Sequence, residues 1–235
     1  MIYIVDFSYD ATTLVALESA FECPVRVIDH HKSAEAGLME FDRLKDNEES
    51  GVFFCLYKSG CVMTWDFFFK GSEETPDILL YVQDRDLWKF EIENSKEVNA
   101  YIATMDEDFE VWDSFFAPVA YDCGVAILKF QQEQIKRRLK DVVLRSLHTP
   151  EPFFNNYPDI PFVNASENQS ELGDALCRAY PEAPFSVSYC DRANGVRSYS
   201  LRSRNGFDVS VVCKAMGGGS HPGAGGFTLD APDVI

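Results

Sequence analysis

Short apolar runs alternate with a helix-periodic stretch at the start of the chain. The apolar run at residues 2–5 ends at Asp6, apolar side chains recur at helical spacing over residues 13–20, and a second apolar run at residues 25–28 ends at Asp29. Apolar runs of this length predict buried strands, and the spacing between them predicts a helix. The pattern therefore predicts a strand–helix–strand unit with parallel strands.

The same alternation continues into the next segments. Residues 51–56, GVFFCL, predict a third buried strand, and residues 59–70 predict a helix with Ser59 as its N-cap. Strands that alternate with helices build a parallel sheet with helices on both of its faces. We therefore predict an α/β fold for this part of the chain.

Helical spacing dominates the middle of the chain. Residues 76–147 predict helices, the last of them a long polar and apolar alternation that could join two domains. Residues 148–161 are rich in Pro and Asn, which end a helix and favour a linker. We therefore expect two domains, residues 1–148 and 149–235.

The last third of the chain mixes both kinds of pattern. It predicts a strand at 161–165, a helix at 170–180, two strands within 185–203 and a helix at 207–216. Asn194-Gly195 predicts the tight turn of a hairpin between the two strands. The glycine-dense segment at residues 217–227 predicts a loop without regular structure. A second, smaller mixed α/β domain follows.

Composition and charge narrow the class of ligand. Hydrophobic residues make up 46% and charged residues 25% of the 235 residues, as in folded globular proteins. The formal net charge is −17, which argues against a basic face for long nucleic acids. A phosphate ligand must then be held locally, and divalent cations would supply the missing positive charge.

Cysteine usage and hydropathy bear on the compartment. The seven cysteines form no CxxC pair, which argues against a disulfide framework and a structural zinc site. The chain shows neither a secretory leader pattern nor an apolar stretch of about 20 residues. We expect a cytoplasmic protein.

Carboxylates and imidazoles gather at the ends of the first two predicted strands. Asp29 is followed at once by His30 and His31, and Asp6 ends the first strand. Open parallel sheets place their ligands at the carboxyl ends of the strands. Mixed oxygen and nitrogen ligands suit manganese, iron or zinc better than calcium. The alternative is that Asp29 caps a helix and the histidines are surface residues.

Two further carboxylates, Asp84 and Asp86, interrupt an otherwise apolar run. A charge enters such a run only with a partner. One interpretation is that this cluster shares a metal with Asp6 and His30. The other is that one of the carboxylates pairs with Arg85 or caps the next helix.

Glycines surround His221 in the segment GGGSHPGAGGF at residues 217–227. The segment begins with Gly217, Gly218 and Gly219. Backbone N–H groups of such a segment can approach an anion closely, and the imidazole adds a directed donor. Arg202 and Arg204, on the preceding strand, could add bidentate phosphate contacts. The alternative is a flexible glycine loop beside exposed arginines.

Several short segments follow one another in a characteristic order: IVDFSY, IDHHKS, YKSG, YVQDRDLW, VNAS with SELG, YSLRS and GGGSHPGAGGF. In this order and spacing the chain resembles the DHH/DHHA1 phosphoesterases, particularly their bacterial and phage branch, and the match runs nearly end to end. The resemblance implies a parallel-sheet DHH domain with flanking helices, followed by a smaller mixed α/β DHHA1 domain.

The resemblance also implies roles for individual residues. Asp6 would be the carboxylate that bridges two metals, and His30 and Asp84 would be further metal ligands. Asp29 and His31 would be the catalytic residues that orient the site and meet the phosphate. Arg202 and the glycine segment around His221 would bind substrate. The implied metal is Mn²⁺ or another divalent ion such as Mg²⁺.

Family members carry an earlier strand and helix with a first motif that holds a histidine and two aspartates. In this chain Met1 lies directly on what resembles the second strand. The expectation is that one metal position keeps about three protein ligands and the other almost none. A truncated sequence is the rival explanation.

These observations predict a metal-dependent phosphoesterase that hydrolyses phosphodiester bonds of short oligonucleotides or of cyclic and other small nucleotides. The alternatives are a catalytically degenerate nucleotide-binding protein and a small-molecule phosphatase or pyrophosphatase-like hydrolase. We expect a short single-stranded oligonucleotide or a small nucleotide as partner, no long duplex and no membrane, with a homodimer as the assembly to test.

Overall fold

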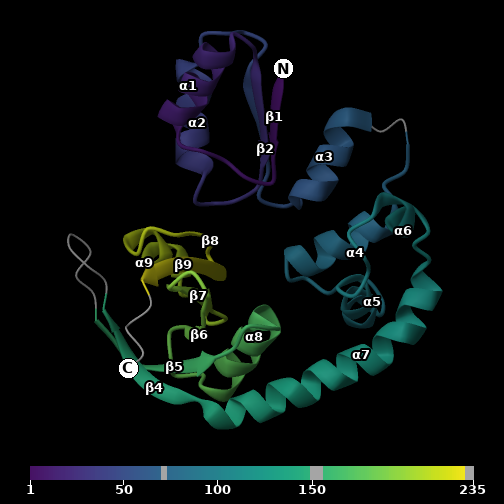
Figure 1. The fold of residues 1–235 in the computed structure, drawn as a ribbon, viewed down its shortest axis with the longest axis vertical. Coiled ribbons are helices and arrows are strands. Elements are labelled where there is room, and N and C mark those ends of the chain that lie inside the picture. The colour runs from purple at the N-terminus through teal and green to yellow at the C-terminus, as the bar shows by residue number, and fades with distance from the viewer. Residues whose placement is uncertain (70–72, 149–155, 231–235) are drawn as a thin grey trace. The chain divides into compact units, whose positions relative to one another are not determined.

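The computed structural model describes residues 1–69, 73–148 and 156–230 (Figure 1). The chain forms two compact units, Met1–Phe130 and Gln131–Ile235. The division lies inside one long helix, upstream of the boundary that the sequence predicts between residues 148 and 149. The predicted linker lies mostly outside the described residues, and strands on both sides of it belong to the same sheet.

A three-stranded parallel sheet organises the first unit. Its strands are β1 (Ile2–Val5), β2 (Val25–Asp29) and β3 (Gly51–Phe54), in the order β1-β2-β3. All three strands are predicted by the sequence, and both pairings are parallel. Because the strands run the same way, their carboxyl ends meet at one edge of the sheet.

Helices cover both faces of this sheet, as the alternation of strands and helices predicts. They are α1 (Ala11–Phe21) and α2 (Glu35–Leu44) on one face and α3 (Gly60–Phe69) on the other (Figure 1). Leu14, Leu38 and Phe41 are fully buried between α1, α2 and the sheet. Burial of each such side chain contributes about 1.5–3 kcal/mol. On the other face, Tyr3 of β1 contacts Phe67 of α3 edge to face.

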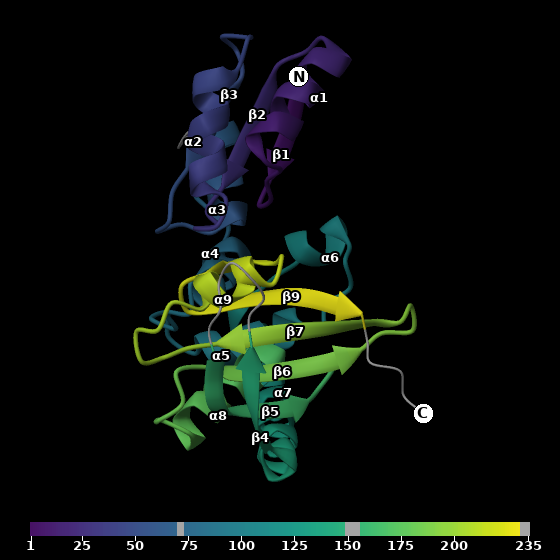
Figure 2. The same cartoon turned by 90° about the vertical axis from the view of Figure 1, so that its left-hand side faces the viewer.

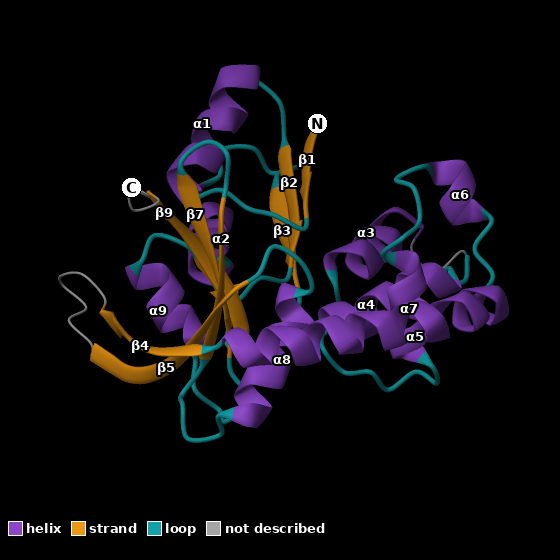
Figure 3. Cartoon of the chain, turned by 60° about the horizontal axis from the view of Figure 1, so that its bottom comes forward, coloured by secondary structure: helices purple, strands orange, loops and turns teal. Residues whose placement is uncertain are grey.

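A cluster of helices completes the first unit (Figure 3). It contains α4 (Asp77–Asp86), α5 (Ser95–Ile102), α6 (Phe109–Asp113) and the first part of α7 (Ala117–Arg138). These helices confirm the helical spacing of the middle segment. Within the part of the chain that the structure describes, no helix combines the length and the apolar character needed to cross a membrane.

The end of the predicted helical segment is not helical. The chain leaves α7 through the 3-10 turn η1 (Leu139–Asp141) and enters strand β4 (Val143–His148). The prediction of helix up to residue 147 is therefore wrong. The adjacent β-branched residues Val142 and Val143 favour extended backbone. As a strand, β4 also gains antiparallel backbone hydrogen bonds with β5, which it could not form as a helix.

The second unit is built on a six-stranded mixed sheet, whose strands β5, β6, β7 and β9 are seen side by side in Figure 2. The strand order is β4-β5-β6-β7-β9-β8, and the pairing of β5 with β6 is parallel. The further strands are β5 (Asn156–Asn164), β6 (Ser186–Asp191), β7 (Val196–Arg202), β8 (Gly219–His221) and β9 (Ala224–Asp230). The hairpin predicted at Asn194-Gly195 joins β6 to β7, and Gly195 has the positive φ of 78° that its turn requires.

The glycine segment forms a hairpin, β8 and β9, and not the irregular loop that its composition predicts. A Cβ atom at Gly226 would lie 2.7 Å from the carbonyl oxygen of Tyr199, and one at Gly218 would overlap the carbonyl oxygen of Gly226. Glycine is needed here because the strands and the chain around them approach each other closely.

Two helices cover the sheet of the second unit. They are α8 (Gln169–Ala179) and α9 (Val209–Ala215), both predicted by the sequence. Val212 of α9 is buried with Leu201 and Phe227 of the sheet. On the opposite face, Gly173 of α8 lies over Arg202. The second unit is therefore a mixed α/β layer structure, as predicted.

Gly124→Ala tests the close crossing of α7 and α5. Alanine in a helix is normally favoured over glycine by about 1 kcal/mol, but a Cβ atom at Gly124 would overlap the carbonyl oxygen of Glu97. We expect a net destabilisation of about 1–3 kcal/mol, since the two helices must separate. Urea unfolding followed by circular dichroism measures it.

Gly37→Ala in α2 is the matched control. A Cβ atom there would be 3.9 Å from the amide nitrogen of Ala11, an ordinary contact. This variant should keep the stability of the parent or gain up to about 1 kcal/mol. Equal destabilisation by the two variants would contradict the described crossing of α5 and α7.

Candidate metal centre

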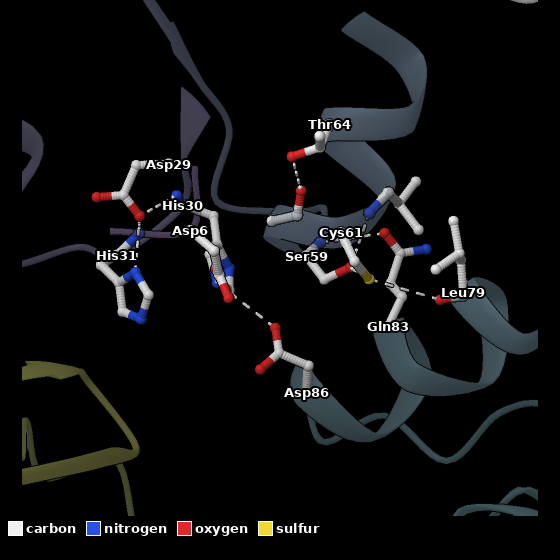
Figure 4. A network of polar contacts seen from close by, with 12 residues as sticks. Asp6, Asp29, His30, His31, Ser59, Cys61, Thr64, Leu79, Gln83 and Asp86 are labelled. Atoms are coloured by element: carbon white, nitrogen blue, oxygen red, sulfur yellow. Dashed lines mark hydrogen bonds and ion pairs between the residues drawn. The ribbon is translucent and has the colours of Figure 1, made fainter. Parts of the chain in front are cut away.

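Acidic and imidazole side chains meet at the carboxyl edge of the parallel sheet (Figure 4). Asp6 follows β1 directly and Asp29 ends β2, and the two strands are in register with Val5 opposite Ile28. His30 is 2% exposed and lies against Asp6. The structure thus brings together the residues that the sequence placed at strand ends.

Asp29 is the buried anchor of this edge. One of its carboxylate oxygens, Oδ1, accepts hydrogen bonds from the backbone N–H groups of His30 and His31, at 2.7 Å and 3.1 Å. The same oxygen lies 2.7 Å from Nδ1 of the His31 ring. With Asp29 ionised, Nδ1–H donates and Nε2 is the ring atom that would meet a ligand.

The contact between Asp29 and His31 shifts the pKa values of both groups. Burial alone would raise the pKa of Asp29, but the hydrogen bonds from the His31 side chain and backbone hold it below its ordinary value. The hydrogen bond to Asp29 raises the pKa of His31, against the opposing effect of burial. Asp29 is therefore a carboxylate, and its charge fixes the orientation of the His31 ring.

A second group forms around the His30 ring. Its Nε2 atom lies 3.0 Å from Oδ1 of Asp6 and 3.5 Å from Oδ2 of Asp86. Burial raises the pKa of the Asp86 carboxyl against the opposing attraction of His30, and the charge of Asp6 raises it further. Two carboxylates converging on one imidazole make a position where a cation would relieve their repulsion.

The backbone around Asp6 is specialised for this placement. Asp6 has φ of 56°, and its N–H donates to the carbonyl oxygen of Ile28 at 2.8 Å. A Cβ atom at Gly60, the first residue of α3, would overlap the Asp6 carboxylate. The absence of a side chain at Gly60 therefore leaves the space that the Asp6 carboxylate occupies.

Asp84 does not join this group, although the sequence predicts it as a metal ligand. It lies inside α4 with 4% exposure, and its two oxygens accept from the backbone N–H groups of Glu91 and Ile92, at 2.9 Å and 3.2 Å. Two residues along a helix correspond to a rotation of about 200° around its axis, so their side chains lie on nearly opposite sides. Only one of Asp84 and Asp86 can therefore face His30. Asp84 holds the turn after α4, and Asp86 faces the site.

The start of α3 is tied to α4 by a polar network (Figure 4). The Ser59 N–H donates to Oε1 of Gln83 at 3.1 Å, and the Ser59 hydroxyl lies 3.1 Å from the Cys61 sulfur. Burial raises the pKa of the Cys61 thiol against the opposing hydrogen bond with Ser59, so the thiol stays neutral. These contacts hold α3, which carries Gly60, in a fixed position against α4, which carries Asp86.

The residues at the sheet edge fit a divalent metal. Ligand atoms of Asp6, Asp29 and His31 all lie within 4.8 Å of one another. The second oxygen of Asp29, Oδ2, is buried and has no hydrogen-bond partner among the described residues. A buried carboxylate oxygen without a donor is costly unless a cation neutralises it. Carboxylate and imidazole together match the preferences of Mn²⁺ and related ions.

In the second unit, Arg202 and His221 lie in one row of the sheet. Both are paired with Ala224 of β9, Arg202 from β7 on one side and His221 from β8 on the other. Residues directly opposite each other on neighbouring strands share a face, so both side chains leave the same face about two strand spacings, roughly 10 Å, apart. The small side chain of Ala224 lies between them.

The two arginines predicted to contact an anion also contact side chains of the second unit. Arg202 Nη2 donates to the Ser170 hydroxyl near the start of α8. Arg204 forms an ion pair with Asp174, which Arg178 also contacts. The guanidinium of Arg204 thus already pairs with a carboxylate of the protein. Gly217, with φ of 79°, and the following two glycines lead from α9 into β8.

Comparison with known proteins gives one sequence relative and several structures of partial similarity. No family model matches it. It is 30% identical over 230 residues to uncharacterized protein R106 of Acanthamoeba polyphaga mimivirus, an alignment that covers 95% of this chain and 52% of that protein. The chain therefore spans about half the length of the curated relative that it matches.

Three solved structures show partial similarity. An uncharacterized protein from Helicobacter pylori G27 has 16% identity and a TM-score of 0.37, covering all of this chain and 78% of that one. The pGpG-specific phosphodiesterase PggH from Vibrio cholerae has 10% identity and a TM-score of 0.37, covering 97% and 92%. An exopolyphosphatase-related protein from Bacteroides fragilis has 12% identity and a TM-score of 0.40, covering 100% and 67%.

The different contacts of Asp84 and Asp86 lead to opposite expectations for two matched variants. Asp84→Asn replaces one acceptor of a backbone N–H by a donor, so we expect a loss of about 1.5–3 kcal/mol of stability. Asp86→Asn removes repulsion with Asp6, so we expect unchanged or slightly higher stability and weaker Mn²⁺ binding. Urea unfolding and manganese titration followed by electron paramagnetic resonance measure both. The reverse pattern would restore Asp84 as the ligand.

Proposed function

We propose that this chain is a divalent-metal-dependent phosphoesterase that hydrolyses phosphodiester bonds in short oligonucleotides or small nucleotides. The observation that supports it best is the convergence of carboxylates and imidazoles at the carboxyl edge of the parallel sheet, where open α/β sheets place their ligands. The substrate class follows from the resemblance of the sequence to the DHH/DHHA1 phosphoesterases.

Asp6 is central to the proposed metal centre because it belongs to two groups of ligands. One group is formed with Asp29 and His31, and the other with His30 and Asp86. A carboxylate has two oxygens and can serve both groups at once, which matches the bridging role that the resemblance implies. Mn²⁺ or Mg²⁺ held there would activate water and neutralise charge on the phosphate.

The remaining groups act on the substrate from fixed positions. Asp29 holds the Nδ1 side of His31, so the opposite ring edge is the part that contacts a phosphate oxygen. An imidazole oriented in this way stabilises negative charge that develops on the phosphate without having to reorient during the reaction. The proposed role of Asp29 is therefore to orient His31 and to lie next to the metal.

The second unit supplies the proposed phosphate-binding surface. Arg202 and His221 flank Ala224 on one face, and a guanidinium and an imidazole at that spacing can contact an anion from two sides. The net charge of −17 opposes binding of long nucleic acids, so local contacts of this kind favour short substrates.

Asp6→Asn should remove most of the activity. We expect hydrolysis of a 5′-labelled RNA dinucleotide with Mn²⁺ to fall at least about a hundredfold in kcat, because both groups of ligands lose their shared carboxylate. Manganese affinity should fall in parallel. Asp42→Asn, an exposed carboxylate of α2 that pairs with Lys45, is the matched control and should retain full activity.

Two results would contradict the proposal. Full activity of Asp6→Asn would exclude the assigned metal centre. Binding of the dinucleotide by the parent chain with no turnover at saturating Mn²⁺ or Mg²⁺ would favour the binding-protein alternative.

Arg202→Ala and His221→Ala should affect substrate binding more than metal binding. We expect each to raise KM for the dinucleotide about tenfold with a smaller change in kcat, since a charge-assisted hydrogen bond is lost in ground state and transition state alike. Arg192→Ala, an exposed arginine near the β6–β7 turn, is the control. Loss of manganese binding with unchanged KM would show that these residues do not bind substrate.

A further inference from the structure

Two exposed aromatic rings lie in the loop that follows Asp6. Phe7 is 52% exposed and Tyr9 is 47% exposed. Their ring centroids are 4.9 Å apart with an interplanar angle of 85°, an edge-to-face contact. The metal and phosphate contacts described above use neither ring. Neighbouring apolar rings that remain half in water in a loop that begins at a candidate metal ligand are candidates for ligand contact.

The loop that carries these rings is fixed at both ends. At one end, the Asp6 N–H donates to the Ile28 carbonyl at 2.8 Å. At the other, Asp10 caps α1 by accepting from the Thr13 N–H at 2.9 Å and the Thr13 hydroxyl at 3.0 Å. Only three residues lie between the fixed ends. The rings are therefore held in place before a ligand arrives, which lowers the entropic cost of binding.

The edge-to-face contact leaves ring faces available. In such a pair the edge of one ring meets one face of the other, so the remaining faces are not used by the pair. Phe7 is the residue next to Asp6, with their Cα atoms about 3.8 Å apart. A phosphate bound at Asp6 would therefore lie at the start of the short loop that carries both rings.

We propose that Phe7 and Tyr9 form a stacking surface for the base adjacent to the scissile phosphate. The inference rests on the proposed phosphoesterase function and names the side chains that would contact the base of its nucleotide substrate. Stacking on an aromatic ring accepts any base, because every base has a π-face. The substrate is then selected for having a base and not for which base it has.

The test compares two substrates that differ only in the base. One is an adenine dinucleotide, and the other is the same phosphodiester with an abasic site in place of each adenosine. For the Phe7→Ala/Tyr9→Ala double variant we expect KM for the adenine dinucleotide to rise about fivefold or more, with less than a twofold change for the abasic compound. Calorimetric affinity for the dinucleotide without metal should fall by a similar factor.

Controls separate stacking from folding. Phe7→Tyr/Tyr9→Phe keeps both rings and should behave as the parent chain. Phe21→Ala removes another exposed aromatic, 64% exposed, at the end of α1, and should leave both substrates unaffected. Thermal unfolding of each variant should stay close to that of the parent.

The outcomes are distinguishable from those of the proposed function. Equal changes for the two substrates, or none for the dinucleotide, would overturn the stacking assignment. Absence of hydrolysis of either substrate by the parent chain would overturn the phosphoesterase proposal, while the calorimetric difference between the parent and the double variant would still decide whether the rings bind the base.

Discussion

The buried carboxylate of Asp29 is the constraint on which the candidate centre depends. A single oxygen of this group receives the backbone N–H groups of His30 and His31 and the His31 ring, so one charge sets the backbone after β2 and the orientation of an imidazole. That arrangement directs the next residue, His30, toward Asp6. The remaining oxygen of Asp29 is buried without a hydrogen-bond donor among the described residues.

Glycine residues allow close approach of neighbouring groups at several places in the structure. Gly60 leaves room for the Asp6 carboxylate at the start of α3, and Gly124 allows α7 to cross α5. In the second unit, Gly226 lies against the Tyr199 carbonyl, so that β8 and β9 can form the hairpin that carries His221. In each case the missing Cβ atom places a functional or framework group nearer than any other residue would allow.

The two units divide the chemistry between residues of different kinds. The first unit gathers carboxylates and imidazoles, which suit a metal, and the exposed rings of Phe7 and Tyr9, which suit a base. The second unit aligns Arg202 and His221 on one face of its sheet, which suits a phosphate. Under the proposed function, a chain with net charge −17 would bind a small anionic substrate through local positive contacts.

The sequence by itself determined the parallel strand ends and the cluster at Asp6 and Asp29, because strand order and apolar period fix which edge of a sheet a residue reaches. The resemblance of the sequence pointed to Asp84 as a ligand, whereas Asp86 is the carboxylate that faces His30. That choice depends on the rotation of α4, which packing against α3 sets. Tertiary pairing likewise turned residues 143–148 into a strand: local spacing there fits a helix, but the ladder with β5 exists only once the sheet has formed.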